Sequence, residues 1–334
     1  MDDFVGSGDV LSKERVKELS KRRNGPGLIY LASHFGAIGV TTYGLFLTQG
    51  TWWCVPIFFL QGVLINFLYA PEHECDHATA FSERWMNVAV ARFCGIFILL
   101  PNDSHRWSHF THHRHTQNWE LDPELTARPV LDTAGKYLWV LSGLPSMIGR
   151  AQELFLHAVG RLDPPYLRPA QKLIVERMAR VYLIVYLAMA VAAVVMQSWW
   201  PVYYWLGPYV LTNWVYWVQG LGEHAGLTHE PHTLLNTRTM KANWFMRWAN
   251  WNMTYHTVHH TYPSVPFYRL PELHKEVERE LGFALPSAGY FELHWGHLKA
   301  LSGGATELGL CAEHDRQIQG SGALSRLTRW TRAT

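Results

Sequence analysis

The stretch from 24 to 71, NGPGLIYLASHFGAIGVTTYGLFLTQGTWWCVPIFFLQGVLINFLYAP, contains 48 residues and no Asp, Glu, Lys or Arg. One membrane-spanning helix needs about 20 apolar residues, so this stretch is long enough for two helices and a short turn. We expect the helices at 28–47 and 52–70, on either side of the polar sequence TQGT.

A second stretch without these charged residues runs from 181 to 222 and contains 42 residues. The sequence Trp199-Trp200-Pro201 divides it into two further expected spans, 181–197 and 202–219. Tryptophan pairs gather at membrane interfaces, and each of the two stretches has such a pair in its middle. The sequence therefore predicts an all-α integral membrane protein with four transmembrane helices in two hairpins.

Two shorter apolar segments, 85–100 and 138–148, have lengths that suit interfacial or re-entrant helices better than spans. The remaining sequence is more polar. We therefore divide the chain into a cytoplasmic N-terminal segment (1–24), a membrane domain (25–300) and a polar, basic C-terminal tail (301–334), which we expect at the surface.

The distribution of basic residues predicts the orientation in the membrane. They cluster before the first and third expected spans, at Lys13, Arg15, Lys17, Lys21, Arg22 and Arg23, and at Lys172, Arg177 and Arg180. Basic flanks stay in the cytoplasm, so each hairpin should begin and end on that side. We expect an inner (cytoplasmic) membrane protein with both termini in the cytoplasm.

Charge and cysteine content exclude other classes of site. The formal net charge of +2 and the absence of a block of like charges argue against a nucleic-acid partner. The four cysteines, Cys54, Cys75, Cys94 and Cys311, are scattered without paired spacing. This pattern indicates neither a disulfide framework nor a CxxC metal site.

Three histidine clusters lie next to the expected cytoplasmic ends of the spans. Their sequences are HECDH (His73, His77), HFTHH (His109, His112, His113) and HTVHH (His256, His259, His260), and a further histidine, His224, follows the fourth span in GEHAGL. Offsets of three and four residues place side chains on one face of a helix. We therefore expect a cytoplasmic helical cap that carries these histidines.

Imidazole is a strong ligand for first-row transition metals, and nine histidines exceed what one ion can hold. Structural zinc sites close with four ligands and catalytic zinc sites usually keep three. The clusters therefore predict a two-metal centre. Ligand type alone leaves iron, zinc and copper open.

Several residues beside the clusters are candidates for a supporting role. Because a ligating imidazole usually donates its second N–H to an acid, Asp76, Asp122 and Glu223 are expected partners of the ligands. His105 begins the string HxxxHxxHH and is either a ligand or a residue that orients one. Isolated histidines such as His34 and His294 are interpreted as packed or hydrogen-bonded residues. His229 and His232 fit loop structure and substrate contact equally well.

The clusters also resemble the motifs of a known family. HxxxH, HxxHH and a late HxxHH, with HFTHHRHTQNWELDPE and YHTVHHTYPSVPFYRLPELH, resemble the histidine boxes of the membrane fatty acid desaturase and hydroxylase superfamily over about residues 25–275. The resemblance implies a non-haem centre of two iron ions that uses O2 on unactivated C–H bonds. It implies nine ligands: His73, His77, His109, His112, His113, His224, His256, His259 and His260.

The resemblance implies an acyl-chain desaturase in the first place. A hydroxylase or monooxygenase of the same superfamily, acting on an alkyl or smaller substrate, is the alternative, and the second box departs from the HxxxHH of the related alkane hydroxylases. Electrons should come from a separate protein such as a ferredoxin with its reductase. A haem electron carrier or a metal transporter fits less well, because the expected spans contain one histidine, His34, and no charged residue.

Overall fold

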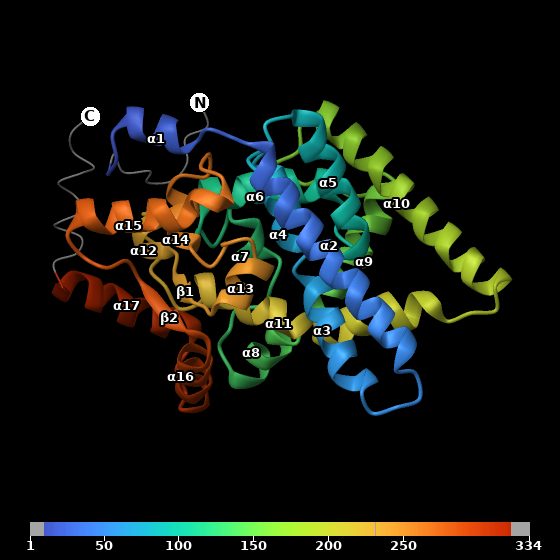
Figure 1. Ribbon diagram of the computed structural model, residues 1–334. Coiled ribbons are helices and arrows are strands. Elements are labelled where there is room, and N and C mark those ends of the chain that lie inside the picture. Colours follow the sequence, from blue (N-terminus) through green and yellow to red (C-terminus); the bar gives the residue numbers. More distant parts are fainter. Residues whose placement is uncertain (1–9, 231, 322–334) are drawn as a thin grey trace. The chain divides into compact units, whose positions relative to one another are not determined.

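The computed structural model describes residues 10–230 and 232–321. The described part is mostly helical, as predicted, and its only sheet pairs β1 (Thr239–Lys241) in parallel with β2 (Ser287–Gly289) (Figure 1). The chain forms two compact units. We call Arg23–Ser108 with Ser142–Tyr216 the span unit, and Met1–Arg22, His109–Leu141 and Trp217–Thr334 the histidine unit.

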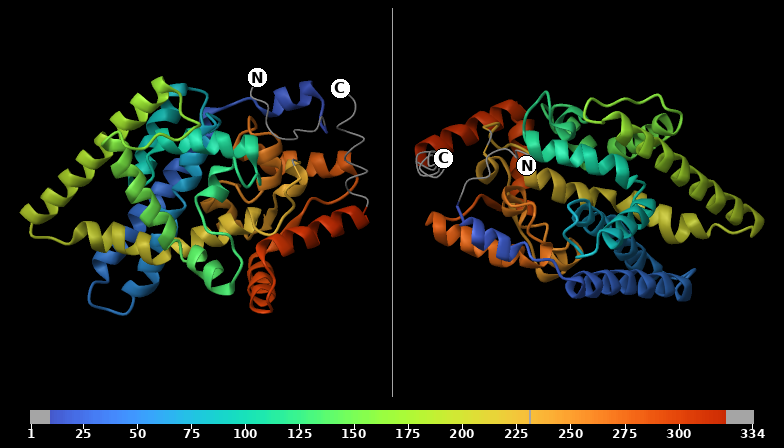
Figure 2. Two further views of the ribbon diagram at one scale, coloured as in Figure 1. Left: turned by 180° about the vertical axis from the view of Figure 1, so that it is seen from behind. Right: turned by 90° about the horizontal axis from the view of Figure 1, so that it is seen from above.

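The span unit contains the long apolar helices. Its elements are α2 (Asn24–Leu47), α3 (Cys54–Asn66), α4 (Tyr69–Asp76), α5 (Arg84–Phe97), α9 (Leu144–Ala158), α10 (Pro169–Val195) and the π-helical turn η1 (Val202–Leu206), together with the first parts of α6 (Asn102–His115) and α11 (Gly207–His224). Figure 2 shows α9 beside the long α10.

Among the described residues, three segments are long and apolar enough to cross a membrane: Asn24–Leu47, Cys54–Asp76 and Pro169–Val195. They contain or overlap the predicted spans at 28–47, 52–70 and 181–197. The third begins twelve residues earlier than predicted, because Pro169 occupies its first turn and the helix continues through charged residues that were interpreted as a flank.

The fourth predicted span, 202–219, is not confirmed. This segment is helical, but it is divided between η1 and α11 and does not meet the same criteria of length and hydropathy. Its buried polar side chains explain the low hydropathy. Thr212 and Asn213 pack inside the span unit, and the Asn213 amide donates to Oδ1 of Asn66 over 2.5 Å.

The segment predicted to be interfacial or re-entrant at 85–100 forms most of α5. Helices α5 and α6 meet at a 102° bend, and the pair forms either a broken span or a re-entrant loop. The bend leaves carbonyls of α5 without helical partners. Three aromatic side chains donate to them: Tyr186 to Ile96 O (3.0 Å), Trp205 to Phe97 O (2.7 Å) and Tyr209 to Ile98 O (2.8 Å). Hydrocarbon contains no water to bond these carbonyls, so the three side chains supply the hydrogen bonds instead.

Helices α2 and α3 form an antiparallel hairpin, and α3 packs closely on α11 (Figure 1). A Cβ atom at Gly62 of α3 would collide with the backbone oxygen of Pro208 and the hydroxyl of Thr212. The Asn66 amide bridges the same helices, because it donates to Tyr209 O (2.9 Å) and Thr212 Oγ1 (3.0 Å). Small residues and polar contacts are the usual means by which helices associate in lipid.

The histidine unit consists of shorter elements around the β1–β2 pair. They are α1 (Lys13–Leu19), α7 (Pro123–Thr126), α8 (Ala134–Leu141), α12 (Thr233–Asn236), α13 (Trp244–Ala249), α14 (His256–Thr261), η2 (Phe267–Arg269), α15 (Leu270–Leu281), α16 (Tyr290–Ser302) and α17 (Glu307–Ser321), with the remainders of α6 and α11. Arg15 of the predicted N-terminal segment joins α1 to α15 through Glu272 (2.8 Å) and Glu276 (2.5 Å).

The predicted C-terminal tail begins inside α16 and includes α17. Part of it is not at the surface, because Glu307 and Cys311 of α17 are buried. The basic residues Arg326, Arg329 and Arg332 lie outside the described residues.

Candidate metal centre

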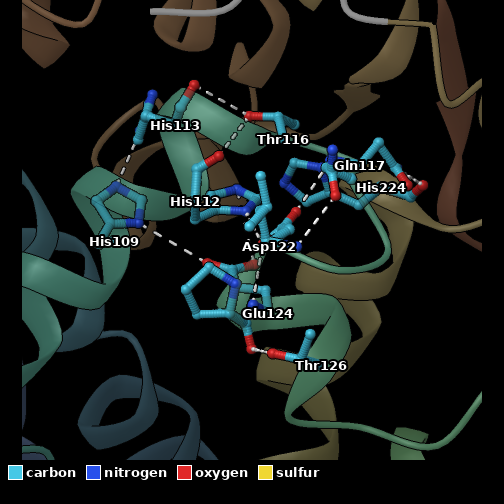
Figure 3. A network of polar contacts seen from close by, with 12 residues as sticks. His109, His112, His113, Thr116, Gln117, Asp122, Glu124, Thr126 and His224 are labelled. Atoms are coloured by element: carbon cyan, nitrogen blue, oxygen red, sulfur yellow. Dashed lines mark hydrogen bonds and ion pairs between the residues drawn. The ribbon is translucent and has the colours of Figure 1, made fainter. Parts of the chain in front are cut away.

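Three histidines from three different helices meet inside the histidine unit. His112 of α6, His224 of α11 and His260 of α14 each offer a ring nitrogen, and these nitrogens lie within 4.8 Å of one another. Their ring centroids are 4.8 to 5.1 Å apart. Figure 3 shows His112 and His224 side by side. The three residues are 36 to 148 positions apart in sequence, so only the fold brings them together.

His256 belongs to the same group. Its Nε2 atom lies 2.8 Å from Nε2 of His224, and its ring centroid lies 4.4 Å from that of His260. The one-turn spacing between His256 and His260 on α14 therefore directs both rings to one side of the helix, as the HTVHH pattern predicted.

The other three histidines of the two HxxHH motifs form a neighbouring group. His109 and His113 face each other with Nε2 atoms 2.9 Å apart, and the ring of His259 lies 5.0 Å from that of His113. All three side chains are buried. Figure 3 shows His109 and His113 on successive turns of α6, aimed toward each other.

His73 and His77, the remaining predicted ligands, lie on the last turn of α4 in the span unit. Their ring centroids are 5.1 Å apart. The ring of Tyr69, one turn earlier, lies 5.5 Å from that of His73.

Two of the predicted supporting acids contact histidines of the centre. Asp122 accepts from Nδ1 of His112 over 2.8 Å, and its second oxygen accepts from the backbone N–H of Gln117 over 2.9 Å (Figure 3). Glu223 lies 3.4 Å from Nδ1 of His256. Both acids are buried. Asp122 bonds Nδ1 of His112 and Glu223 lies beside Nδ1 of His256, so Nε2 of each ring is the nitrogen that would bind a metal.

The third acid, Asp76, contacts His105 in the span unit. His105 Nδ1 lies 2.8 Å from Asp76 and 3.0 Å from Glu72, and the amide of Asn102 bridges the same two carboxylates. Glu72, Asp76 and His105 together could hold a cation. The sequence interpretation did not single out Glu72, whose spacing of four residues before Asp76 was the available signal.

Burial sets the charge state of the histidines. It lowers the pKa of His224 to about 3, with the nearby His112 contributing in the same direction, and it lowers the pKa values of His259 and His260 well below the usual range. These imidazoles are therefore neutral near pH 7, which is the form that binds metals. Burial also raises the pKa of the Glu223 carboxyl, which favours its protonated form until a cation is nearby.

The polar atoms of the cluster fit a bound metal. Nδ1 of His260 contacts the Thr116 hydroxyl at 3.2 Å, whereas its buried Nε2 has no hydrogen-bond partner among the described residues. Two pairs of Nε2 atoms face each other at 2.8 and 2.9 Å. A buried nitrogen without a partner, such as Nε2 of His260, is costly unless a cation binds it. The donor set of neutral imidazoles suits iron, zinc or copper.

Other histidines serve packing and loop structure. His34 is buried in α2 and contacts Leu64 O at 2.8 Å, and His294 contacts the Tyr137 hydroxyl at 2.6 Å. His229 lies between Gln117 O (2.7 Å) and the indole N–H of Trp119 (3.0 Å), which favours the structural interpretation for this residue. Both interpretations of His232 stay predictions.

Replacing Asp122 with Asn should weaken the centre without unfolding the unit. An uncharged amide oxygen accepts hydrogen bonds from His112 and Gln117 more weakly than the carboxylate does. His112 therefore loses its fixed orientation. We expect a loss of about 10- to 100-fold in metal affinity or activity. Metal titration of the purified variant measures it, with Glu120→Gln as control because that side chain is exposed. Wild-type affinity in Asp122→Asn would contradict this role.

Comparisons with known proteins agree on one family. Residues 50–291, which include all nine histidines predicted as ligands, match the family model described as fatty acid desaturase. The chain is 26% identical to the sphingolipid delta(4)-desaturase DES1 of Drosophila melanogaster over 245 residues, covering 71% of this chain and 69% of that protein. It is 26% identical to the dihydrorhizobitoxine desaturase of Bradyrhizobium elkanii over 305 residues, covering 86% and 84%. A segment of 73 residues is 34% identical to an sn-1 acyl-lipid omega-3 desaturase (ferredoxin) of Nostoc sp., covering 22% and 20%.

Proposed function

Because the chain belongs to the fatty acid desaturase family, we propose that it is an O2-dependent diiron enzyme that introduces a C=C bond into an acyl chain. Family membership and the apolar helices make it a membrane oxidoreductase of the desaturase type. The observation that carries the proposal is the convergence of buried histidines from α6, α11 and α14.

We assign the nine histidines to two iron ions. His112, His224, His256 and His260 hold one ion, and His109, His113 and His259 contribute to the other. His73 and His77 of the span unit are assigned as iron ligands because the resemblance to the family's histidine boxes implies it. The short contacts within each group of the histidine unit support this division. The spacing of His73 and His77 on one turn of α4 supports their joint role.

The iron pair, when bound with O2, supplies the oxidising power that removes hydrogen from an unactivated C–H bond. The protein supplies position and exclusion of water. Asp122 keeps His112 in the tautomer that carries hydrogen on Nδ1, so Nε2 is the atom that would bind the metal. Burial keeps the imidazoles of His259 and His260 neutral. The burial of His109 and His113 beside them limits the access of bulk water.

Electrons should come from a separate protein such as a ferredoxin with its reductase. Three of the four cysteines are buried, and none lies at the spacing of an iron–sulfur site. The partial relative from Nostoc sp. is named for ferredoxin. We place the metal centre on the cytoplasmic side, because the basic flanks of the predicted spans favour that orientation.

The experiment is product analysis after supplying oxygen-18 gas, ferredoxin and reductase to the iron-loaded protein, once with extracted membrane lipids and once with free fatty acids. Desaturation removes two hydrogens from the substrate, and two donor electrons complete the reduction of O2 to two waters, so the product gains a double bond and no labelled oxygen. A product that contains one labelled oxygen would instead establish the alternative, a hydroxylase or monooxygenase. The length of the match to dihydrorhizobitoxine desaturase makes a smaller substrate the second candidate, so small metabolites should be profiled in parallel.

A further inference from the structure

Arg150 on α9 of the span unit is a cation without an anionic partner. No carboxylate of a described residue lies within 4.0 Å of its guanidinium, although the side chain is partly buried. Its contacts are both through Nη1, to Ile98 O (3.2 Å) and to the Tyr209 hydroxyl (3.3 Å). Buried or partly buried arginines are normally paired, so the missing anion requires an explanation.

The free donors of Arg150 can be reached from solvent. Nε and Nη2 make no hydrogen bond within the described chain, and neither is among the polar atoms that are sealed from solvent without a partner. Nε and Nη2 form the planar fork that arginine uses to bind a carboxylate or phosphate through two parallel hydrogen bonds.

Aromatic rings lead from Arg150 to a proposed iron ligand. The guanidinium lies 5.6 Å from the ring centroid of Tyr216. The Tyr216 ring lies 4.8 Å from the Tyr69 ring, and the Tyr69 ring lies 5.5 Å from the His73 ring, measured between centroids. All of these residues belong to the span unit. An anion bound by Arg150 would therefore be separated from His73 by two tyrosine rings.

A purely structural role does not account for Arg150. The Ile98 carbonyl already accepts a shorter bond, 2.8 Å, from the Tyr209 hydroxyl. Glu153, one turn further along α9, interacts with Arg150 through space but does not lie within ion-pair distance, and burial raises the pKa of its carboxyl, which makes it a weaker counterion. The Ile98 carbonyl therefore has another donor, and among the described residues no carboxylate forms an ion pair with Arg150.

We infer that Arg150 binds the terminal oxyanion of the substrate, and that the substrate is a molecule with a free carboxylate rather than an esterified acyl chain. This inference rests on the proposed function for the identity of the reaction near His73. A lipid phosphate has similar chemistry, and the experiment below separates it from a carboxylate.

The test is calorimetric titration of the full-length, detergent-solubilised protein with octanoate, methyl octanoate and octyl phosphate. We expect octanoate to bind about 10- to 100-fold more tightly than the ester, as hydrogen bonds to a charged group imply. Arg150→Gln should remove this preference, and Arg150→Lys should keep part of it, because lysine retains the charge but not the planar fork.

Arg180→Gln is the matched control. Arg180 also donates to a carbonyl at a helix end, Ala158 O (2.8 Å), but it has a carboxylate partner in Glu176 (3.3 Å). Its loss should leave the preference unchanged. Equal binding of acid and ester by the wild type, or an unchanged preference in Arg150→Gln, would overturn the inference. Tighter binding of octyl phosphate than of octanoate would also overturn it, in favour of a phosphate headgroup.

The two proposals can fail separately. Binding is measured without O2, an electron donor or turnover. Selective binding of octanoate through Arg150 with no desaturated product would contradict the proposed function and leave the oxyanion site standing.

Discussion

In the His260→Ala variant we expect no detectable product and a clear loss of bound iron, with the protein still inserted in the membrane. Nε2 of His260 is buried and has no hydrogen-bond partner among the described residues, while Nδ1 is held by Thr116. The ring is therefore fixed with one lone pair available for a metal. Alanine removes this metal-binding nitrogen. The substitution does not shorten α14, whose other histidines are also buried. Elemental analysis and product assay measure the result.

His274→Ala is the matched control for this substitution. His274 lies on α15, 3.4 Å from Glu278 on the next turn, and belongs to none of the metal-binding groups found among the described residues. The control should retain iron and activity. Iron at the wild-type level in His260→Ala, measured in protein that remains inserted, would remove His260 from the ligand set and weaken the proposed two-iron centre.

The largest expected effect on stability is that of Glu307→Ala. Glu307 of α17 pairs with Arg128 through two bonds of 2.5 and 3.0 Å, and it also accepts from the backbone N–H of Leu131 over 2.8 Å. The side chains are only 9% (Arg128) and 4% (Glu307) exposed. Removal of the carboxylate leaves a buried guanidinium without its counterion and the buried Leu131 amide without an acceptor. We expect a loss of about 3–5 kcal/mol in the free energy of unfolding.

The same helix offers the control. Glu313 pairs with Arg316 over 2.5 Å, but these side chains are 53% and 67% exposed, and solvent screens such pairs. Glu313→Ala should therefore leave the denaturation midpoint unchanged. Chemical denaturation of the detergent-solubilised protein, followed by circular dichroism, compares the two variants. Equal midpoints for Glu307→Ala and Glu313→Ala would show that burial of the first pair carries no extra stability.

Local spacing in the sequence could predict which histidines share a helical face. The pairs His109/His113 and His256/His260 each lie one turn apart, and in the structure each pair converges. Spacing could not predict that His112, His224 and His260 approach one another, because that depends on the packing of α6, α11 and α14. Their common position beside the membrane was inferred from the spans, and their role as ligands remains a proposal.

The pattern of charged residues in the sequence predicted helix ends less well than histidine spacing predicted shared helical faces. It also did not show which cations lack a partner. The helix that begins at Pro169 contains Lys172, Glu176, Arg177 and Arg180 before its apolar part, so the absence of charge marked only its second half. The sequence did not single out Arg150 among the basic residues. Only three-dimensional contacts show that it has no carboxylate partner among the described residues.

The aromatic donors at the bend after α5 also constrain how the chain is made. Tyr186, Trp205 and Tyr209 lie 90, 108 and 111 residues beyond the carbonyls that they satisfy. At about 5–20 residues per second, a ribosome supplies the last of them roughly 5–20 seconds after Ile98. During that delay the carbonyls of Ile96 and Phe97 lack these aromatic donors and hydrocarbon offers none, so the bend must remain hydrated. The bend between α5 and α6 can enter the bilayer only when α10, η1 and the start of α11 have been synthesised.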